Sequence, residues 1–336
     1  MLRRFLAAAF LVFLALLLLL MAWPQLVGME RTFGFAQVVS LRGGLVAIAA
    51  LGILVAIIVL VLAPPLRRFA ASVAALLLVF ALLNVAVLQT RGLGDQAFET
   101  PGDSTITVLA WNTLGDAPGA TAVAELVEQT GADVVVLPET TAELRGEVED
   151  ILEASGTSMQ GFTLAYDQIS KARSTSMLVS RDLGEYVLDG TVGNSAVLPS
   201  LVAKPVDGNG PTLVGIHLVA PIPGEFDRWQ QDLEWAATAC ADENVIMAGD
   251  FNATLDHFTN ADEVGHVVGD CVDAAQASDN GGVGTWPTDV PALLGAPIDH
   301  VLATTNWQVT GMRVIESHDK YGSDHRPVLA QLAPAG

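Results

Sequence analysis

The sequence predicts an α/β domain, built from a pair of sheets with helices outside, that follows three transmembrane helices. Residues 1–90 are dominated by Leu, Ala and Val, whereas residues from about 103 onward have the mixed composition of a globular domain. In that second part, strand-length apolar runs recur with only a few helical patterns between them. Because the helices are too few to cross over between every pair of strands, a sheet pair fits better than a fully alternating parallel sheet.

Three uncharged apolar runs cover 5–23, 45–62 and 69–88, the last with one polar break at Asn84. Each run is long enough to cross a bilayer core as a helix. The first run could instead be a cleaved signal peptide, but its apolar region is long and no small-residue cleavage site follows it. We therefore expect residues 1–90 to form a membrane anchor.

Basic residues near the ends of these runs predict the orientation. Arg3 and Arg4 precede the first run, and Arg67 and Arg68 separate the second from the third. With both pairs in the cytoplasm, three crossings place all that follows outside, although the opposite loop, 24–42, carries two arginines as well. The prediction is a multi-pass protein of the cell membrane, with a cytoplasmic N-terminus and an extracytoplasmic catalytic domain.

Residues 91–102 have the Gly-rich and polar composition of a short linker, which leaves residues 103–336 as the globular domain. Predicted strands cover 105–111, 133–139, 174–180, 212–220, 244–250, 298–304 and 326–332. Helical spacing of apolar residues predicts helices at 120–130, 141–154 and 226–240.

Charge is distributed unevenly along the chain. Residues 1–95 hold seven of the 16 basic residues and two of the 37 acidic ones, so the remainder has a formal net charge of −26. Such a surface repels polyanions, which disfavours a domain that grips a long nucleic acid through many phosphates. A single phosphate contact made through a metal is compatible with it.

The two cysteines, Cys240 and Cys271, fit no metal-binding spacing. Outside the cytosol they could form one disulfide; the alternative is two separate, small buried side chains. The predicted compartment favours the disulfide.

Polar side chains stand at the ends of the predicted strands, where a strand can fix their position. Taken singly, each has an ordinary interpretation as a turn residue, a helix cap or a buried histidine. Asp299 and the next residue, His300, must point to opposite sides of their strand. Together the strand-end residues form a set of oxygen ligands, amides and imidazoles: Asn112, Glu139, His217, Asp250, Asn252, Asp299, Asp324 and His325.

Oxygen ligands select magnesium, manganese or calcium over zinc. The set therefore predicts metal-assisted hydrolysis at phosphorus, in which a metal neutralises phosphoryl oxygens and a base activates water.

In chain order, the motifs WN, LPE, HLVAP, GDFN, GTW followed by IDH, and SDHRP resemble those of the endonuclease/exonuclease/phosphatase superfamily, from about 106 to 332. Its members include deoxyribonuclease-like nucleases and neutral sphingomyelinases. The resemblance implies a four-layer α/β/β/α sandwich with the site at one end of the two sheets. It also implies a metal-dependent phosphoric ester hydrolase that uses Mg²⁺, or Mn²⁺ or Ca²⁺.

The family roles can be transferred to matching positions. Glu139 would be the principal metal ligand, with Asn112 and Asp324 assisting. His325 would contact the phosphoryl group and act as base, oriented by Asp299 as in a catalytic dyad.

Three further positions match. Asp250 would orient the attacking water or handle the leaving-group proton, and Asn252, with Asn112, would hold the phosphate. His217 would bind the phosphate or protonate the leaving oxygen. Which residue is the general acid and which the base stays open.

Some features depart from the family pattern. The basic or bulky residue often found before the Ile-Asp pair is replaced by Ala296 and Pro297, and residues 253–283 form a long segment without a basic cluster. Three histidines, His257, His266 and His318, match no motif and are interpreted as loop residues. A lipid phosphoester or small organic phosphate fits this acidic, anchored domain best; the alternatives are an extracellular nuclease and a non-catalytic, membrane-anchored binding protein.

Overall fold

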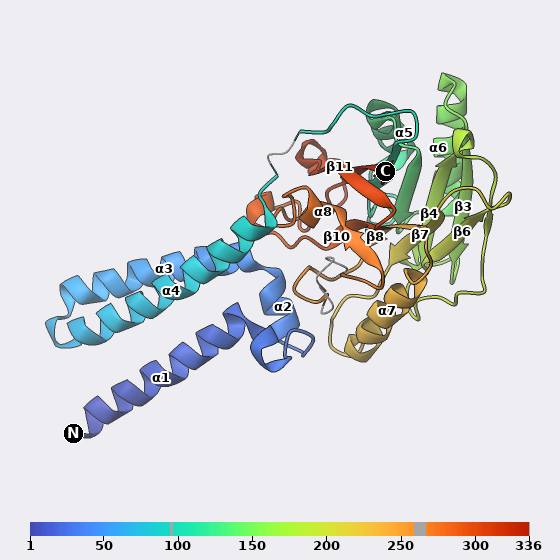
Figure 1. Ribbon diagram of the computed structural model, residues 1–336. Helices are drawn as coiled ribbons and strands as arrows, with labels where there is room; N and C mark the ends of the chain where they lie inside the picture. The colour runs from blue at the N-terminus through green and yellow to red at the C-terminus, as the bar shows by residue number, and fades with distance from the viewer. Residues whose placement is uncertain (95–96, 259–266, 336) are drawn as a thin grey trace.

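Three long helices project away from a two-sheet domain in the computed structural model, which describes residues 1–94, 97–258 and 267–335 (Figure 1). They are α1 (Leu2–Ala22), α3 (Arg42–Leu62) and α4 (Arg67–Arg91), and the short helix α2 (Phe35–Ser40) lies between α1 and α3. Each long helix is apolar enough to cross a membrane. A helix of 21 residues, like α1 or α3, spans about 31 Å, the thickness of a bilayer's hydrocarbon core.

Two six-stranded mixed sheets form the domain that follows. The first has the order β11-β12-β1-β2-β4-β3 and the second the order β5-β6-β7-β8-β10-β9. The first sheet consists of β1 (Ile106–Ala110), β2 (Val134–Pro138), β3 (Met159–Ala165), β4 (Ser174–Ser180), β11 (Trp307–Val314) and β12 (Val328–Pro334). The second consists of β5 (Tyr186–Leu188), β6 (Leu201–Pro205), β7 (Thr212–His217), β8 (Val245–Asp250), β9 (Cys271–Asp273) and β10 (Asp299–Thr304).

Helices cover the outer faces of both sheets. Helices α5 (Gly119–Thr130) and α6 (Ala142–Ser155) bury one apolar stripe each against the first sheet, and α7 (Phe226–Ala239) does so against the second. A fourth, short helix, α8 (Ala274–Ala277), adds two alanines to the core between the sheets. The domain therefore has three apolar cores, one between the two sheets and one between each sheet and its helices. Burial of apolar area is the main stabilising contribution, and these three cores separate the four layers. The predicted α/β/β/α sandwich is confirmed.

The register of the strands brings the site together. β1 and β2 are parallel, as are β7 and β8, so their carboxyl ends lie at the same edge of each sheet. β12 and β10 run antiparallel to these pairs and begin at that edge. In the second sheet, Asp250 pairs with His217 on one side and with Asp299 on the other.

All seven strands predicted from apolar runs are present. The five that were not predicted are β3, β5, β6, β9 and β11. Most of β3 and β11 is half-buried, and β5 and β9 have three residues each, so these strands lack the long apolar run by which buried strands are recognised.

Cys240, at the end of α7, and Cys271, at the start of β9, form a disulfide with their Cα atoms 6.0 Å apart. The bond closes a loop with a sequence separation of 31, and such a constraint lowers the entropy of the unfolded chain. The structure thus decides between the two interpretations of the cysteines in favour of the disulfide.

Replacing both cysteines by serine should lower the free energy of unfolding by about 2–4 kcal/mol. The measurement is the midpoint of chemical unfolding of the full chain in detergent. Reductant should lower the midpoint of the wild type by a similar amount and leave that of the double variant unchanged. An equal response of both proteins to reductant would contradict the prediction.

Candidate active site

The centre of the site is a buried pair, Asp299 and His325, contributed by different sheets. His325 Nδ1 lies 2.8 Å from Asp299 Oδ2. The backbone of His325 is fixed on both sides, since Trp111 Nε1 donates to its carbonyl oxygen at 2.9 Å and its N–H donates to Ser323 Oγ at 3.0 Å. The imidazole is therefore held with Nε2 free to face the site.

Asp250 lies beside this pair, with its Oδ2 3.8 Å from His325 Nε2. The backbone N–H of Asn252 donates to Asp250 Oδ1 at 2.8 Å, and the Asn252 side chain donates to Leu218 O at 2.9 Å and to Asp250 Oδ2 at 3.2 Å. The preceding Gly249 has φ 137°, and a Cβ there would overlap the carbonyl oxygen of Ile216 on β7. Only glycine allows this close approach of the two strands.

Asn112 links the carboxylates of the two sheets. Its Nδ2 donates to Glu139 Oε1 at 3.2 Å and to Asp250 Oδ2 at 3.1 Å, while its Oδ1 accepts from the N–H of Leu114 at 3.0 Å. Glu139 directly follows β2 with φ 60°, an uncommon left-handed conformation for such a residue. Backbone strain of this kind is concentrated at functional sites.

His217 and Asp324 complete the set. His217 Nε2 lies 3.9 Å from Glu139 Oε1, and its Nδ1 lies 3.5 Å from the hydroxyl of Thr175. Asp324 Oδ2 accepts from Trp286 Nε1 at 2.9 Å, and its Oδ1 lies 4.0 Å from His325 Nε2. This buried Oδ1 has no hydrogen-bond partner among the described residues. All eight predicted residues therefore lie at one edge of the sandwich.

Burial and mutual charge shift the pKa values of these groups. Burial lowers the pKa of His217 to about 3, helped by the charge of His325, so His217 is neutral at physiological pH. Burial raises the pKa of Glu139, against the hydrogen bond from Asn112. Burial and the Asp299 charge raise the pKa of Asp250, although His325 opposes them. Burial lowers the pKa of His325, but the charges of Asp299 and Asp250 outweigh it and raise the pKa.

The donor set fits a divalent cation that prefers oxygen. Glu139 and Asp324 supply carboxylates, and Asp324 Oδ1 is the oxygen without a partner among the described residues. The two carboxylate charges repel each other, and a cation between them would offset this repulsion. Asn112 fits this set less directly, because its amide oxygen already accepts from Leu114. A second group, Asp250, Asp299 and His325, has potential ligand atoms within 4.8 Å of one another. In this second group Asp299 Oδ1 is also without a partner among the described residues, but His325 Nδ1 is already hydrogen-bonded to Asp299, so the first set is the better candidate for a cation.

Several supporting residues were not singled out from the sequence. Thr285 Oγ1 accepts from the backbone N–H groups of Ile298 and Asp299, both at 3.1 Å. Arg326 is fully buried and donates to the carbonyl oxygens of Pro287 and Val290 and to Asp319. The sequence did contain a signal for the role of Arg326, since a charged residue stands directly after His325 and before a buried strand. A buried arginine needs hydrogen-bond and ion-pair partners of this kind.

Three further histidines of the described residues, His257, His300 and His318, lie outside the site. As predicted, His300 points away from it, with Nδ1 2.6 Å from Asp273 Oδ2 and Nε2 2.9 Å from Ala253 O. His257 does lie in a loop, but it is fully buried against α2. His266 lies outside the described residues.

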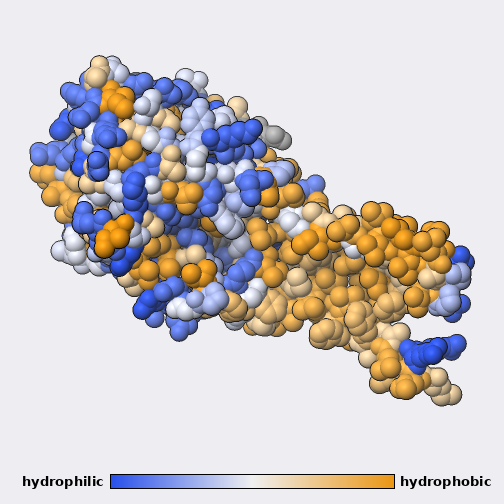
Figure 2. All heavy atoms as spheres, turned by 180° about the vertical axis from the view of Figure 1, so that it is seen from behind, coloured by the Kyte–Doolittle hydropathy of each residue, from blue (hydrophilic) through white to orange (hydrophobic). Residues whose placement is uncertain are grey.

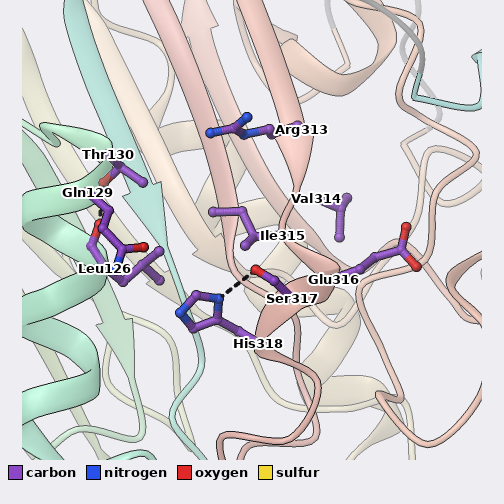
Figure 3. Close-up of a pocket in the computed structure, with 9 residues that line it drawn as sticks. All are labelled: Leu126, Gln129, Thr130, Arg313, Val314, Ile315, Glu316, Ser317 and His318. Carbon is purple, nitrogen blue, oxygen red and sulfur yellow. Dashed lines mark hydrogen bonds between the residues drawn. The ribbon is translucent and has the colours of Figure 1, made fainter.

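The third unmatched histidine, His318, lines a pocket of about 360 Å³ on the outer side of the first sheet (Figure 3). It ends a 3-10 helix (Glu316–His318) and is mostly buried, rather than lying in an open loop. The pocket lies between α5 and residues 313–318, and its lining includes none of the eight candidate residues. This pocket is therefore separate from the cluster of candidate residues at the strand ends.

A family model matches residues 109–325, and its description is the endonuclease/exonuclease/phosphatase family. The chain belongs to this family. The match begins in β1 and ends at His325, so it includes all eight candidate residues.

Solved structures share the fold of this family member. An endonuclease/exonuclease/phosphatase from Beutenbergia cavernae is 18% identical with a TM-score of 0.52, covering 69% of this chain and 72% of the other. D. rerio TDP2 complexed with single-strand DNA product is 19% identical with a TM-score of 0.51, covering 68% and 99%. The 3′ phosphatase NExo from Neisseria, bound to product DNA hairpin, is 15% identical with a TM-score of 0.50, covering 67% and 98%. A comparison with curated proteins gives no significant match.

Replacing Gly249 by alanine should lower the free energy of unfolding by about 2 kcal/mol or more, since the new Cβ meets backbone and φ is unfavourable. Gly190→Ala is the matched control, because a Cβ there meets nothing, and should change stability by less than about 0.5 kcal/mol. Thermal unfolding of both variants in detergent measures the difference. Equal midpoints would contradict the close approach of β7 and β8.

Proposed function

We propose that the protein is a membrane-anchored, divalent-metal-dependent phosphoric ester hydrolase that acts outside the cytosol. The observation that carries this proposal is the buried Asp299–His325 pair, with Asp250 alongside, in a domain of this family. A binding protein has no need of a buried, oriented imidazole next to three carboxylates, which are costly to desolvate.

Glu139 and Asp324, with Asn112 after reorientation of its amide, would hold Mg²⁺, or Mn²⁺ or Ca²⁺. When bound, the cation supplies positive charge that binds phosphoryl oxygens and offsets the carboxylates that raise the pKa of His325. The unpartnered oxygen of Asp324 supports this assignment.

His325 is the proposed base for the attacking water. With Nδ1–H donated to Asp299, the neutral imidazole presents an unprotonated Nε2, which can accept a proton from water. Asp250, 3.8 Å from that nitrogen, orients the water. Asn252 and Asn112, whose side-chain amides both donate to Asp250 Oδ2, are the proposed phosphate-binding residues.

His217 is the proposed donor to the phosphate or to the leaving oxygen. Its burial keeps it neutral, so it carries one N–H and can donate a hydrogen bond without adding charge. Its Nε2 lies 3.9 Å from Glu139 Oε1, one of the proposed metal ligands.

Three apolar helices support the membrane anchor, and the paired arginines near their far ends support a cytoplasmic N-terminus. The disulfide supports an extracytoplasmic domain, because such bonds persist in oxidising compartments. The formal charge of −26 after residue 95 favours a lipid phosphoester or a small organic phosphate over a long nucleic acid.

An extracellular nuclease is the second candidate. Two of the similar structures, TDP2 and NExo, were solved with DNA products, although at these identities they share only the fold. Digestion of plasmid and single-stranded DNA at low and moderate salt separates the candidates. Cleavage abolished by Glu139→Ala, without hydrolysis of lipid or small phosphoesters, would favour the nuclease.

His325→Ala and Asp299→Asn should each lower kcat for a hydrolysed phosphoester by about 10²–10⁴-fold. The assay is a panel of lipid, nucleotide and small phosphoesters with Mg²⁺, Mn²⁺ or Ca²⁺, run on the full chain. Glu143→Gln, an exposed acid on α6, is the control and should retain wild-type kcat. If no member of the panel is hydrolysed by the wild type, the proposed function is wrong.

Glu139→Gln should abolish hydrolysis at ordinary metal concentration, because it removes a charged ligand. Chelation of divalent ions should have the same effect on the wild type, and excess Mg²⁺ should restore the wild type but restore the variant only partly. Titration of Mn²⁺ binding by calorimetry provides a readout apart from activity. The affinity of the variant for Mn²⁺ should be at least about 10-fold lower than that of the wild type. Unchanged binding would contradict the assignment of Glu139.

A further inference from the structure

The charge cluster around Asp256 joins the membrane helices to the catalytic domain. Asp256 is buried, and its carboxylate accepts from Arg42 at 2.6 and 2.9 Å and from Arg91 at 2.8 Å. Gln25 adds a hydrogen bond at 3.1 Å. Burial opposes ionisation of Asp256, but the two guanidinium groups outweigh it and lower its pKa, so the carboxylate is charged.

All three long helices meet at this cluster. Arg42 begins α3 and also donates to Ala22 O, at the end of α1, and to Asn84 Oδ1 on α4. Arg91 ends α4, and its carbonyl oxygen accepts from the N–H of Gly281 in the catalytic domain. The ends of the apolar helices are thereby fixed to each other and to the domain by buried, charge-assisted hydrogen bonds.

The loop between α1 and α3 also packs into the domain. Ala36 on α2 is fully buried and belongs to the core that α7 forms with the second sheet. Its carbonyl oxygen lies 3.1 Å from His257 Nε2, Arg31 donates to His257 O at 2.6 Å, and the ring of Phe33 contacts that of Phe226. The segment 24–41 is therefore a structural part of the domain and not a free loop.

Three loops of the active site rest on this membrane-side region. Asp256 lies four residues after Asn252, and Pro221, whose carbonyl oxygen accepts from Gln37, lies four residues after His217. The loop that carries Trp286 continues into a 3-10 helix (Ala292–Leu294), which packs so closely on α3 that a Cβ on Gly43 would overlap Leu293. Four residues span at most about 14 Å, so the phosphate-binding residues lie close to the helix ends.

Apolar side chains are exposed around this junction. Leu26, Val27 and Phe33 in the segment 24–41, and Ile222 and Leu293 in the active-site loops, are each about half exposed or more. Figure 2 shows hydrophobic residues covering the helices and continuing onto the adjoining part of the domain. Such a surface next to membrane helices matches the interfacial layer of a bilayer, which is about 5–8 Å thick on each side.

We infer that this joint holds the active site at the membrane surface, so that the substrate is a phosphoester carried by a lipid of the same bilayer. The inference rests on the proposed function and assigns its substrate class. A lipid headgroup reaches such a site without removal of its acyl chains from the membrane, a removal that costs free energy for every methylene exposed. A lipid in another bilayer would have to leave it.

The location is tested without activity. The full chain carrying Ile222→Cys, labelled with an environment-sensitive fluorophore and reconstituted in phosphatidylcholine vesicles, should be quenched by lipids bearing a spin label near the headgroup. Glu147→Cys is the control, because α6 lies on the side of the domain away from the helices (Figure 1). Equal quenching at the two positions would overturn the inference.

The substrate class is tested in the same vesicles. Phosphatidylcholine, phosphatidylethanolamine and phosphatidylglycerol are supplied either in the enzyme's own vesicles or in separate ones, with soluble bis(p-nitrophenyl) phosphate as a third arm. We expect lipid hydrolysis at least 10-fold faster in the shared bilayer. Asp256→Asn should reduce this preference at least 5-fold and keep the hydrolysis rate of the soluble ester within about 3-fold of the wild type. If Asp256→Asn does not fold, Arg91→Gln replaces it. The control is Asp207→Asn, at an exposed position.

The outcomes separate the two proposals. Hydrolysis of the soluble ester without a preference for the shared bilayer would overturn the inference and leave the proposed function standing. Hydrolysis of none of the phosphoesters would contradict the proposed function, and the lipid substrate would fall with it. The quenching measurement alone would then decide whether the joint fixes the domain at the membrane.

Discussion

The burial of Asp250 between two sheets is the constraint on which the site depends. A carboxylate without solvent is stable only when its oxygens are hydrogen-bonded. Asn112 from the first sheet and Asn252 from the loop after β8 supply these bonds, and His325 lies 3.8 Å away. Because the donors come from both sheets, the packing of the sandwich and the geometry of the site are determined together.

The same requirement recurs at each neighbouring group. Asp299 is held through its N–H by Thr285, Asp324 by Trp286, and the backbone of His325 by Trp111 and Ser323. These contacts fix side chains that the proposed chemistry needs in one orientation. Two carboxylate oxygens of the site, Asp324 Oδ1 and Asp299 Oδ1, are the exceptions, because they have no hydrogen-bond partner among the described residues.

A second buried carboxylate, Asp256, gives the chain its overall organisation. It lies six residues after Asp250 and pairs with arginines at the ends of α3 and α4. A buried ion pair is not in itself evidence of stability, but removal of one partner leaves buried charge uncompensated. The three apolar helices and the two-sheet domain are thereby coupled in position, and the loop that carries Asn252 is coupled to both.

The sequence by itself determined the fold class and the three apolar helices, and it predicted eight candidate residues that the structure brings to one edge of the sandwich. It did so because buried strands have recognisable apolar runs and because polar residues at their ends are costly unless they are used. Edge strands such as β3 and β11 were not predicted, since half-buried strands lack that pattern. The supporting roles of Thr285 and Arg326 were not predicted either, because a hydrogen-bond partner distant in sequence leaves no local signal.

Only the tertiary structure decided which groups touch. The pairing of Cys240 with Cys271, the contact of Asn112 with two carboxylates, and the packing of Ala36 into the core of the second sheet all join distant segments. The sequence predicted residues 24–42 as a loop between two membrane helices, and residues 253–283, which include Asp256, as a long segment without a basic cluster. In the folded structure Asp256 and the ends of the apolar helices form a single joint. The reason is that desolvation of the Asp256 carboxylate is costly unless Arg42 and Arg91 compensate its charge.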